Sequence, residues 1–274
     1  RGKFPVKDHQ ALAQLLGLLG QSRLANNVNQ LAKAASLIEP SATRDRLTAG
    51  MHLPRDEADA VGVIELALEA TVAAEPVEAK IRELGGQPAF PAQISRNHIA
   101  AHYCSPPGDP TTVQPGDIVK LDCGTHVDGY VTDNATTVDL RDGEGSLLCA
   151  ASRMALENAI AVMGPGVSLT EVGRQVETTI ESMGFKPVRN LCGHGVARYT
   201  IHCAPSVPNY ADSKAAKLRP NMTIACEPFA SDGKGMIDVD GIAEVFMLKR
   251  DVRPKDNLPA VVEKAMQQSD GLPF

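Results

Sequence analysis

The chain has 274 residues, of which 43% are hydrophobic, enough for one large domain or two small ones with a real core. A net charge of −6 without a Lys/Arg run argues against a nucleic-acid groove or an anionic membrane surface. The six cysteines form no C-x-x-C pair, and the apolar run Ala11–Gly20 is too short to span a bilayer. We therefore expect a globular, cytoplasmic protein with reduced thiols and no membrane partner.

The N-terminal part is expected to be helical. Residues 10–38 have apolar side chains at helical spacing, and a poorly patterned connection follows them. A second helical pattern runs from Asp56 to about Glu75. We expect residues 1–50 to be a helical extension of unknown role and residues 51–274 to form the main domain.

The next segment alternates helix, strand and loop signals. Pro76 begins a helix that continues through Leu84 and is closed by a Gly-Gly pair. Pro88–Ser95 is predicted to be a short extended piece, and the proline-rich Ser105–Thr112 stretch a loop.

A hairpin with one carboxylate in each strand follows. The runs Ile118–Cys123 and Tyr130–Val138 are β-rich, and a Gly/His/Asp segment between them is expected to be the loop. If Asp122 lies directly opposite Asp133, both carboxylates face one point and repel unless a cation lies between them. This pattern favours a metal site; the alternative is two solvated carboxylates on an open sheet face.

The second half begins with two predicted helices. Leu147–Met163 has a helical pattern. Ser168 and Glu171 have the spacing of a capping box, which predicts the start of another helix that ends at Gly184.

Parts of the chain occur twice. Val77-Glu78-x-x-Ile81 recurs as Val176-Glu177-x-x-Ile180, and the strand that ends at Asp122 resembles the one that ends at Glu227. Such a long period predicts two similar halves whose equivalent acids converge on one central site. The alternative is a chance match, because V-E-x-x-I is a common helical string.

Histidines supply the remaining candidate groups. His194 lies between two glycines that let the backbone approach closely and aim the ring. Three carboxylates with one imidazole suit Mn, Fe, Co or Zn in a hydrolase. His102 and His202 lie on apolar stretches, where each is either a half-buried, hydrogen-bonded histidine or a catalytic group, and His126 lies in the hairpin loop.

Several runs carry a family resemblance. They are Phe90-Pro91, Ala100-Ala101-His102-Tyr103, Lys120-Leu121-Asp122-Cys123-Gly124, Asn190-Leu191, Gly193-His194, Ile201-His202 and Glu227-Pro228-Phe229. Over roughly residues 52–274 the sequence resembles type II methionine aminopeptidases of the pita-bread metallopeptidases. The resemblance implies an α/β pita-bread fold of two pseudo-symmetric halves with a central antiparallel sheet covered by helices.

The resemblance also implies roles for individual residues. It implies that Asp122, Asp133, His194 and Glu227 hold two divalent metal ions (Co, Mn, Fe or Zn), with Asp133 bridging the two ions. It further implies that His102 and His202 are catalytic and substrate-binding, and that Phe90 lines the pocket for the methionine side chain. The expected activity is hydrolysis of the N-terminal methionine from peptides and nascent proteins by a metal-activated water, in a monomer.

The family pattern contains a further bridging glutamate on a final strand, which this sequence does not reach. The resemblance therefore implies a domain that is incomplete at its C-terminus, and we expect weak metal binding and slow turnover. Two alternatives stay open at this stage. One is an Xaa-Pro peptidase of the same fold, and the other is a pita-bread adaptor protein without catalysis.

Overall fold

The computed structural model describes residues 75–106, 108–141, 147–241, 244–247 and 258–274. The predicted extension over residues 1–50 and the helix expected from Asp56 lie outside this part and stay predictions. The elements in chain order are α5 (Glu75–Glu83), β1 (Gln87–Pro88), β2 (Gln93–Arg96), β3 (Ile118–Val127), β4 (Tyr130–Asp139), α6 (Leu147–Val162), α7 (Leu169–Ser182), β5 (Lys186–Pro187), β6 (Cys192–Ala197), β7 (Thr200–Pro208), β8 (Thr223–Ala225), β9 (Ala230–Ser231) and α8 (Ala260–Gln268).

The first half packs α5 against an antiparallel sheet. Its strands have the order β1-β3-β2, and β4 pairs with β3. Val77 and Ile81 lie one turn apart on α5 and bury their side chains against Ile94 and Leu121 of the sheet. The burial of this apolar stripe explains why a helix of only nine residues is stable here.

The second half also packs helices on an antiparallel sheet. α6 and α7 pack on each other through small and branched side chains, including Ala155, Ala159 and Val172, all fully buried. Beneath them lie an antiparallel sheet of order β7-β6-β8 and the short pair β5–β9. Val176 and Ile180 on α7 are buried in this core, as Val77 and Ile81 are in the first. This agreement supports the predicted duplication.

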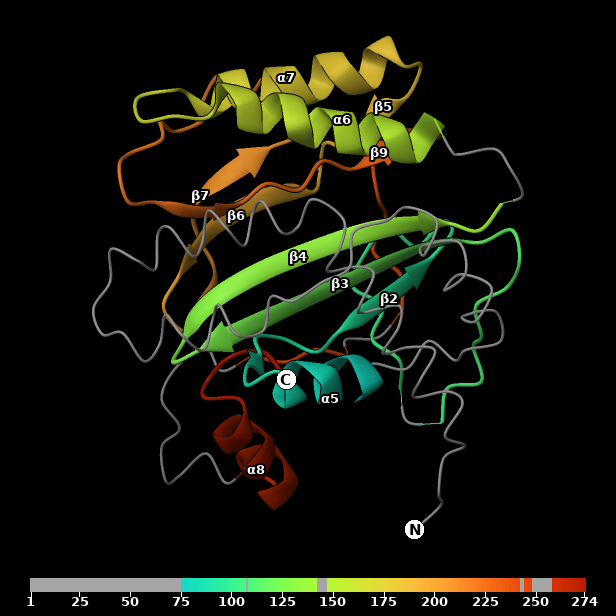
Figure 1. Ribbon diagram of the computed structural model, residues 1–274, viewed down its shortest axis with the longest axis vertical. Helices are drawn as coiled ribbons and strands as arrows, with labels where there is room; N and C mark the ends of the chain where they lie inside the picture. Colours follow the sequence, from blue (N-terminus) through green and yellow to red (C-terminus); the bar gives the residue numbers. More distant parts are fainter. Residues whose placement is uncertain (1–74, 107, 142–146, 242–243, 248–257) are drawn as a thin grey trace.

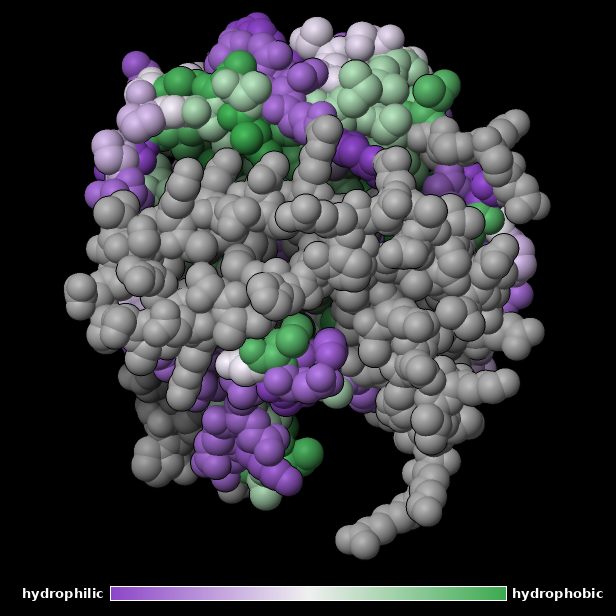
Figure 2. Space-filling model, viewed as in Figure 1, coloured by the Kyte–Doolittle hydropathy of each residue, from purple (hydrophilic) through white to green (hydrophobic). Residues whose placement is uncertain are grey.

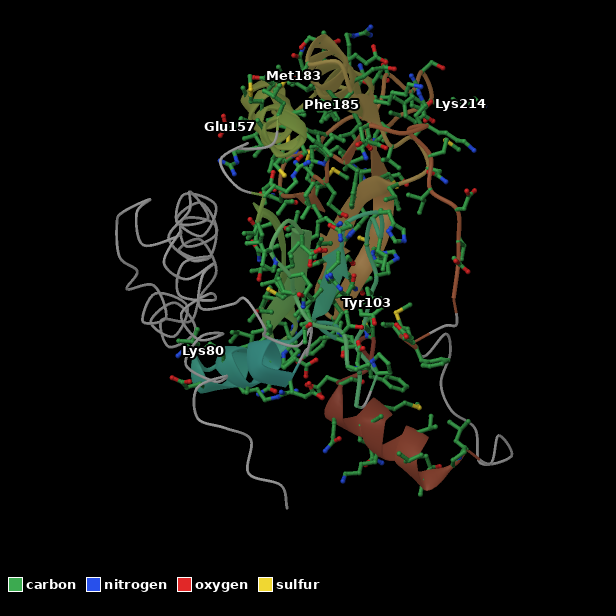
Figure 3. The ribbon with its side chains drawn as sticks, turned by 90° about the vertical axis from the view of Figure 1, so that its right-hand side faces the viewer. Lys80, Tyr103, Glu157, Met183, Phe185 and Lys214 are labelled. Carbon is green, nitrogen blue, oxygen red and sulfur yellow. The ribbon has the colours of Figure 1, made fainter. Side chains whose placement is uncertain are left out.

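The two halves lie along one axis of the molecule. Figure 1 shows α6 and α7 at one end, α5 and α8 at the other, and the strands between them. The view turned by 90° agrees, with Lys80 of α5 at one end, and Met183, Phe185 and Lys214 at the α6–α7 end (Figure 3). Strand β4 of the first sheet lies next to β6 and β7 of the second. The expected pita-bread architecture of two helix-backed antiparallel halves is therefore observed.

The outer surface of the helical layer is mixed in polarity. Leu147, Met154 and Ile160 of α6 are exposed, and Figure 2 shows apolar and polar residues side by side over α6 and α7. Within the described residues, no helix has both the length and the apolar character needed to cross a membrane.

The hairpin register differs from the prediction. Asp122 lies opposite Ala135, and Asp133 lies opposite Gly124, so the two acids are not directly paired. The segment expected to be a loop continues strand β3 to Val127, and only Asp128 and Gly129 form the turn. The observed register differs from the predicted one by an even number of residues. Both acids therefore still point to the same side of the sheet, as diagonal neighbours.

The start of α7 also differs in detail from the predicted capping box. Ser168 is the N-cap, but its Oγ accepts the backbone N–H of Thr170 at 3.2 Å. The Glu171 carboxylate instead accepts hydrogen bonds from Arg174 and Gln175. One half of the reciprocal cap is thus replaced by contacts one helical turn further along.

The tips of two hairpins are joined. The β6–β7 turn consists of Arg198 and Tyr199, just as the β3–β4 turn consists of two residues. Tyr199 N–H donates to the Gly129 carbonyl at 2.8 Å, and Arg198 Nε donates to the Asp128 carbonyl at 2.9 Å. The Tyr199 ring covers Gly129 so closely that an added Cβ would lie 2.3 Å from it. This turn-to-turn joint holds the two halves together at the end of their long strands.

A buried carboxylate, Asp117, stabilises the start of β3 through hydrogen bonds. Asp117 is 5% exposed and accepts hydrogen bonds from Arg96 Nε at 2.7 Å and Asn97 Nδ2 at 2.8 Å. The Gln114 N–H donates to it at 2.8 Å. Burial alone would raise the pKa of Asp117, but these donors outweigh it and lower the pKa below its usual value.

We predict that Asp117→Asn lowers the free energy of unfolding by roughly 1–3 kcal/mol at pH 7 because charged hydrogen bonds are lost. Since the folded pKa lies below the unfolded one, this stabilisation is present above about pH 4 and is lost as the pH falls through the folded pKa. Urea denaturation at pH 7 and at about pH 3 measures it, with the exposed Asp232→Asn as control. A loss that is equal at both pH values would contradict this account.

Candidate metal centre

The first two acids of the site come from one sheet face. Asp122 lies on β3, and Asp133, opposite Gly124, lies diagonally across from it on β4. Their strands run antiparallel in continuous register, so the positions of both side chains are fixed by backbone hydrogen bonds. The hairpin therefore supplies two carboxylates without relying on a flexible loop.

The imidazole comes from an irregular strand in the second half. His194 lies on β6 where the pairing with β7 shifts register. A Cβ on Gly193 would lie 2.2 Å from the Ala225 carbonyl oxygen, and one on Gly195 would lie 2.4 Å from that of Ala204. Both neighbours of His194 must be glycines for the strands to approach this closely. The expectation that these glycines allow a close approach of the backbone is therefore confirmed.

The His194 ring is oriented by its own backbone. Its Nδ1 donates to the Gly195 carbonyl at 3.1 Å, which leaves Nε2 to face the acids. Nε2 lies 3.3 Å from Asp133 Oδ2 and 3.0 Å from Glu227 Oε1. The candidate ligand atoms of Asp133, His194 and Glu227 all lie within 4.8 Å of one another.

Glu227 completes the group from just beyond β8. The preceding Ala225 pairs with His194, so the chain delivers Glu227 beside the imidazole. The strand expected to run to Glu227 ends at Ala225, which is a correction to the predicted equivalence with Asp122. The two acids nevertheless lie close enough for the charge of Glu227 to raise the pKa of Asp122.

The charges of this cluster are unbalanced. Burial raises the pKa of Asp122 to about 8, and the carboxylates of Asp133 and Glu227 act in the same direction. Burial alone would lower the pKa of His194, but these two carboxylates raise it to about 10. A protonated imidazole thus stands where a metal-bound imidazole would be neutral.

Two buried carboxylate oxygens of this cluster favour a bound cation. Asp122 Oδ1 and Glu227 Oε1 are buried without a hydrogen-bond partner among the described residues, although Glu227 Oε1 lies near His194. Unpaired buried carboxylate oxygens are costly unless a cation neutralises them. Carboxylate oxygens with one imidazole nitrogen are a donor set suited to Mn, Fe, Co or Zn, so the residues present fit a divalent metal.

The other two predicted histidines lie beside this cluster. The rings of His194 and His202 are in edge contact, with centroids 4.1 Å apart. Burial and the charge of His194 lower the pKa of His202, and His102 acts in the same direction. Both residues have solvent-exposed surface, and their catalytic and substrate-binding roles stay predictions.

Phe90 lies on the same sheet face as the carboxylates. A Cβ on Gly124 would lie 2.3 Å from the Phe90 ring, so the ring covers the strand position between Asp122 and the turn. Phe90 belongs to an apolar cluster with Val131, Ile201 and Leu272 that draws on both halves. An apolar wall therefore adjoins the acidic centre.

Sequence reasoning missed one buried polar residue at this site. Gln93 lies directly opposite Asp122 in the β2–β3 ladder, is 7% exposed, and accepts the His102 N–H through Oε1 at 3.0 Å. Its polar side chain in a strand that is otherwise buried was the available signal. Its position opposite Asp122 can be recognised only once the strand register is known.

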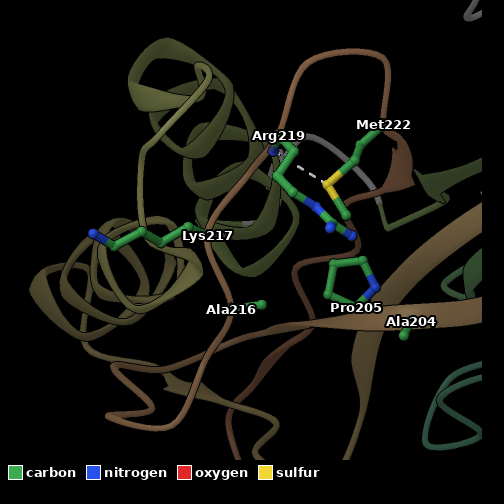
Figure 4. A pocket seen from close by; sticks show the side chains of 6 residues that line it. All are labelled: Ala204, Pro205, Ala216, Lys217, Arg219 and Met222. Carbon is green, nitrogen blue, oxygen red and sulfur yellow. Dashed lines mark hydrogen bonds between the residues drawn. The ribbon is translucent and has the colours of Figure 1, made fainter.

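A separate pocket of about 370 Å³ lies elsewhere. It is lined by Ala204, Pro205, Ala216, Lys217, Arg219 and Met222. Figure 4 shows the Arg219 side chain across it, with the Arg219 backbone N–H donating to Met222 Sδ at 3.2 Å. None of the predicted site residues lines this pocket, so the metal centre and the pocket are distinct features.

Two helix-backed antiparallel halves with carboxylates and an imidazole converging between them define a pita-bread metallopeptidase. The chain belongs to metallopeptidase family M24, whose sequence model matches residues 30–251.

Named relatives support this assignment. A methionine aminopeptidase of Archaeoglobus fulgidus is 47% identical over 184 residues, which cover 66% of this chain and 62% of that protein. One of Methanothermobacter thermautotrophicus is 39% identical over 232 residues, covering 83% of this chain and 77% of that protein. The crystal structure of a methionine aminopeptidase from Thermotoga maritima superposes with a TM-score of 0.59 at 30% identity, covering 66% of this chain and 77% of that one. The chain thus spans less than two thirds of the length of the Archaeoglobus protein.

We predict that Glu227→Gln weakens Mn(II) binding by at least about tenfold, because the substitution removes a charged ligand of the cluster. Isothermal titration calorimetry on the purified chain measures it. Glu263→Gln, on the exposed side of α8, is the matched control and should bind Mn(II) like the wild type. Equal affinities of all three proteins would show that the cluster is not the metal site.

Proposed function

We propose that this chain is a metal-dependent aminopeptidase that removes N-terminal methionine from peptides and nascent proteins. The observation that carries the proposal is the convergence of Asp133, His194 and Glu227 beside Asp122, on the sheet face that Phe90 covers. The names of the relatives, all methionine aminopeptidases, support this activity over an Xaa-Pro peptidase or an adaptor.

In this proposal Asp122, Asp133, His194 and Glu227 hold two divalent cations. Bound divalent cations lower the pKa of water and polarise a scissile carbonyl. The protein supplies the rest: preorganised donors at the point where negative charge develops on the substrate.

His102 and His202 are the proposed donors to the substrate. Both residues have solvent-exposed surface, and the His202 ring lies against the His194 ring. A lowered pKa keeps His202 neutral near pH 7, so one ring nitrogen can donate while the other accepts. Such a group can hold the scissile amide or donate to the oxyanion.

The apolar cluster around Phe90 is the proposed pocket wall for the methionine side chain. It adjoins the carboxylates, so a substrate whose unbranched thioether lies against Phe90 presents its first peptide bond to the centre. Orientation of this kind converts binding energy into rate.

We predict that the chain releases methionine from Met-Ala-Ser only with added Mn(II) or Co(II), and that Glu227→Gln lowers kcat/KM by at least about a hundredfold. Detection of free methionine by mass spectrometry measures it, with Glu263→Gln as control and Ala-Pro-Ser to detect Xaa-Pro cleavage. A chain that binds Mn(II) stoichiometrically and cleaves neither peptide would overturn the aminopeptidase activity and favour an adaptor.

A further inference from the structure

Gln93 is a buried polar residue beside the proposed metal centre. Gln93 lies opposite Asp122 on β2, so both side chains project from the same face of the ladder. It is 7% exposed, and polar side chains at such positions need a partner. The partner is not Asp122 Oδ1, which has none among the described residues.

The observed partner is the backbone of His102. Gln93 Oε1 accepts the His102 N–H at 3.0 Å. His102 has φ +69°, a conformation that residues other than glycine adopt rarely. Such a conformation persists only where surrounding contacts over-determine it.

The next residue is fixed to the same strand by other bonds. Ile94 N–H donates to the Tyr103 carbonyl at 3.0 Å, and Tyr103 N–H donates to Ser95 Oγ at 3.3 Å. The Tyr103 hydroxyl donates to Asp109 at 2.8 Å. Several hydrogen bonds therefore hold Tyr103, whereas the His102 N–H is held by its hydrogen bond to Gln93.

The backbone conformation of His102 sets the direction of its Cα–Cβ bond, and that direction limits the region that the exposed imidazole can reach. We propose that Gln93 is a positioning residue: its Oε1 holds the backbone of His102 in the left-handed conformation that aims the imidazole at the substrate beside Asp122. This inference rests on the proposed function of His102.

The test is a double-mutant cycle with Gln93→Met, which keeps the length of the side chain and removes the acceptor. Gln93→Met should lower kcat on Met-Ala-Ser at least about tenfold with little change in KM. The double variant Gln93→Met/His102→Ala should be no slower than His102→Ala within about twofold. Additive losses would show that Gln93 acts through another group and would overturn the proposal.

Readouts independent of activity separate positioning from general damage. Exchange of the His102 amide hydrogen, followed by NMR, should be at least about tenfold faster in Gln93→Met, while Mn(II) affinity and Tm stay close to the wild type. Ser95→Ala, which removes the acceptor one residue further along, is the matched control and should leave the His102 amide protected. Unchanged His102 exchange in Gln93→Met would overturn the proposal. If the wild type released no methionine, the proposed function would fail, and the exchange data would still decide whether Gln93 holds His102.

Discussion

The structure depends on one electrostatic constraint: three carboxylates must share a partly buried space around a single imidazole. Without a cation, His194 carries a proton to compensate for Asp133 and Glu227, while Asp122 stays protonated into the neutral range. Among the described residues, Asp122 Oδ1 is buried without a hydrogen-bond partner, and the buried Glu227 Oε1 has the His194 imidazole as its charged neighbour. The two halves therefore bring together a site that is unfavourable unless it is filled, as expected where function rather than stability determines the arrangement.

Much of this arrangement follows from local rules. The apolar positions of α5 and α7 could be read from helical spacing, and the repeat of Val77 and Ile81 at Val176 and Ile180 correctly indicated two similar halves. Period-two alternation placed Asp122 and Asp133 on one face although the register was wrong. The error arose because the two-residue turn at Gly129 was hidden inside a longer run of turn-forming residues.

The remainder depends on tertiary contacts that leave little trace in local patterns. The bond from His102 to Gln93 requires knowledge of which strand lies at the edge of the sheet. The aim of the His194 ring depends on a hydrogen bond to the Gly195 carbonyl, at a point where the pairing of β6 with β7 shifts register. Each involves a side chain that bonds backbone outside regular pairing, which periodicity cannot reveal.

The joint between the two hairpin tips has a consequence for how this architecture can vary. Asp133 lies on the strand that leaves the Gly129 turn, and His194 lies on the strand that enters the Tyr199 turn. Because the two turns are bonded to each other, this joint helps to fix the distance between the two ligands. An insertion in either turn would separate the tips and leave the ligands to find their spacing through the strands alone. Surface loops usually tolerate added length. Here the two-residue turns of the β3–β4 and β6–β7 hairpins fix the spacing of the ligands. Insertions are therefore expected in other connections of the chain.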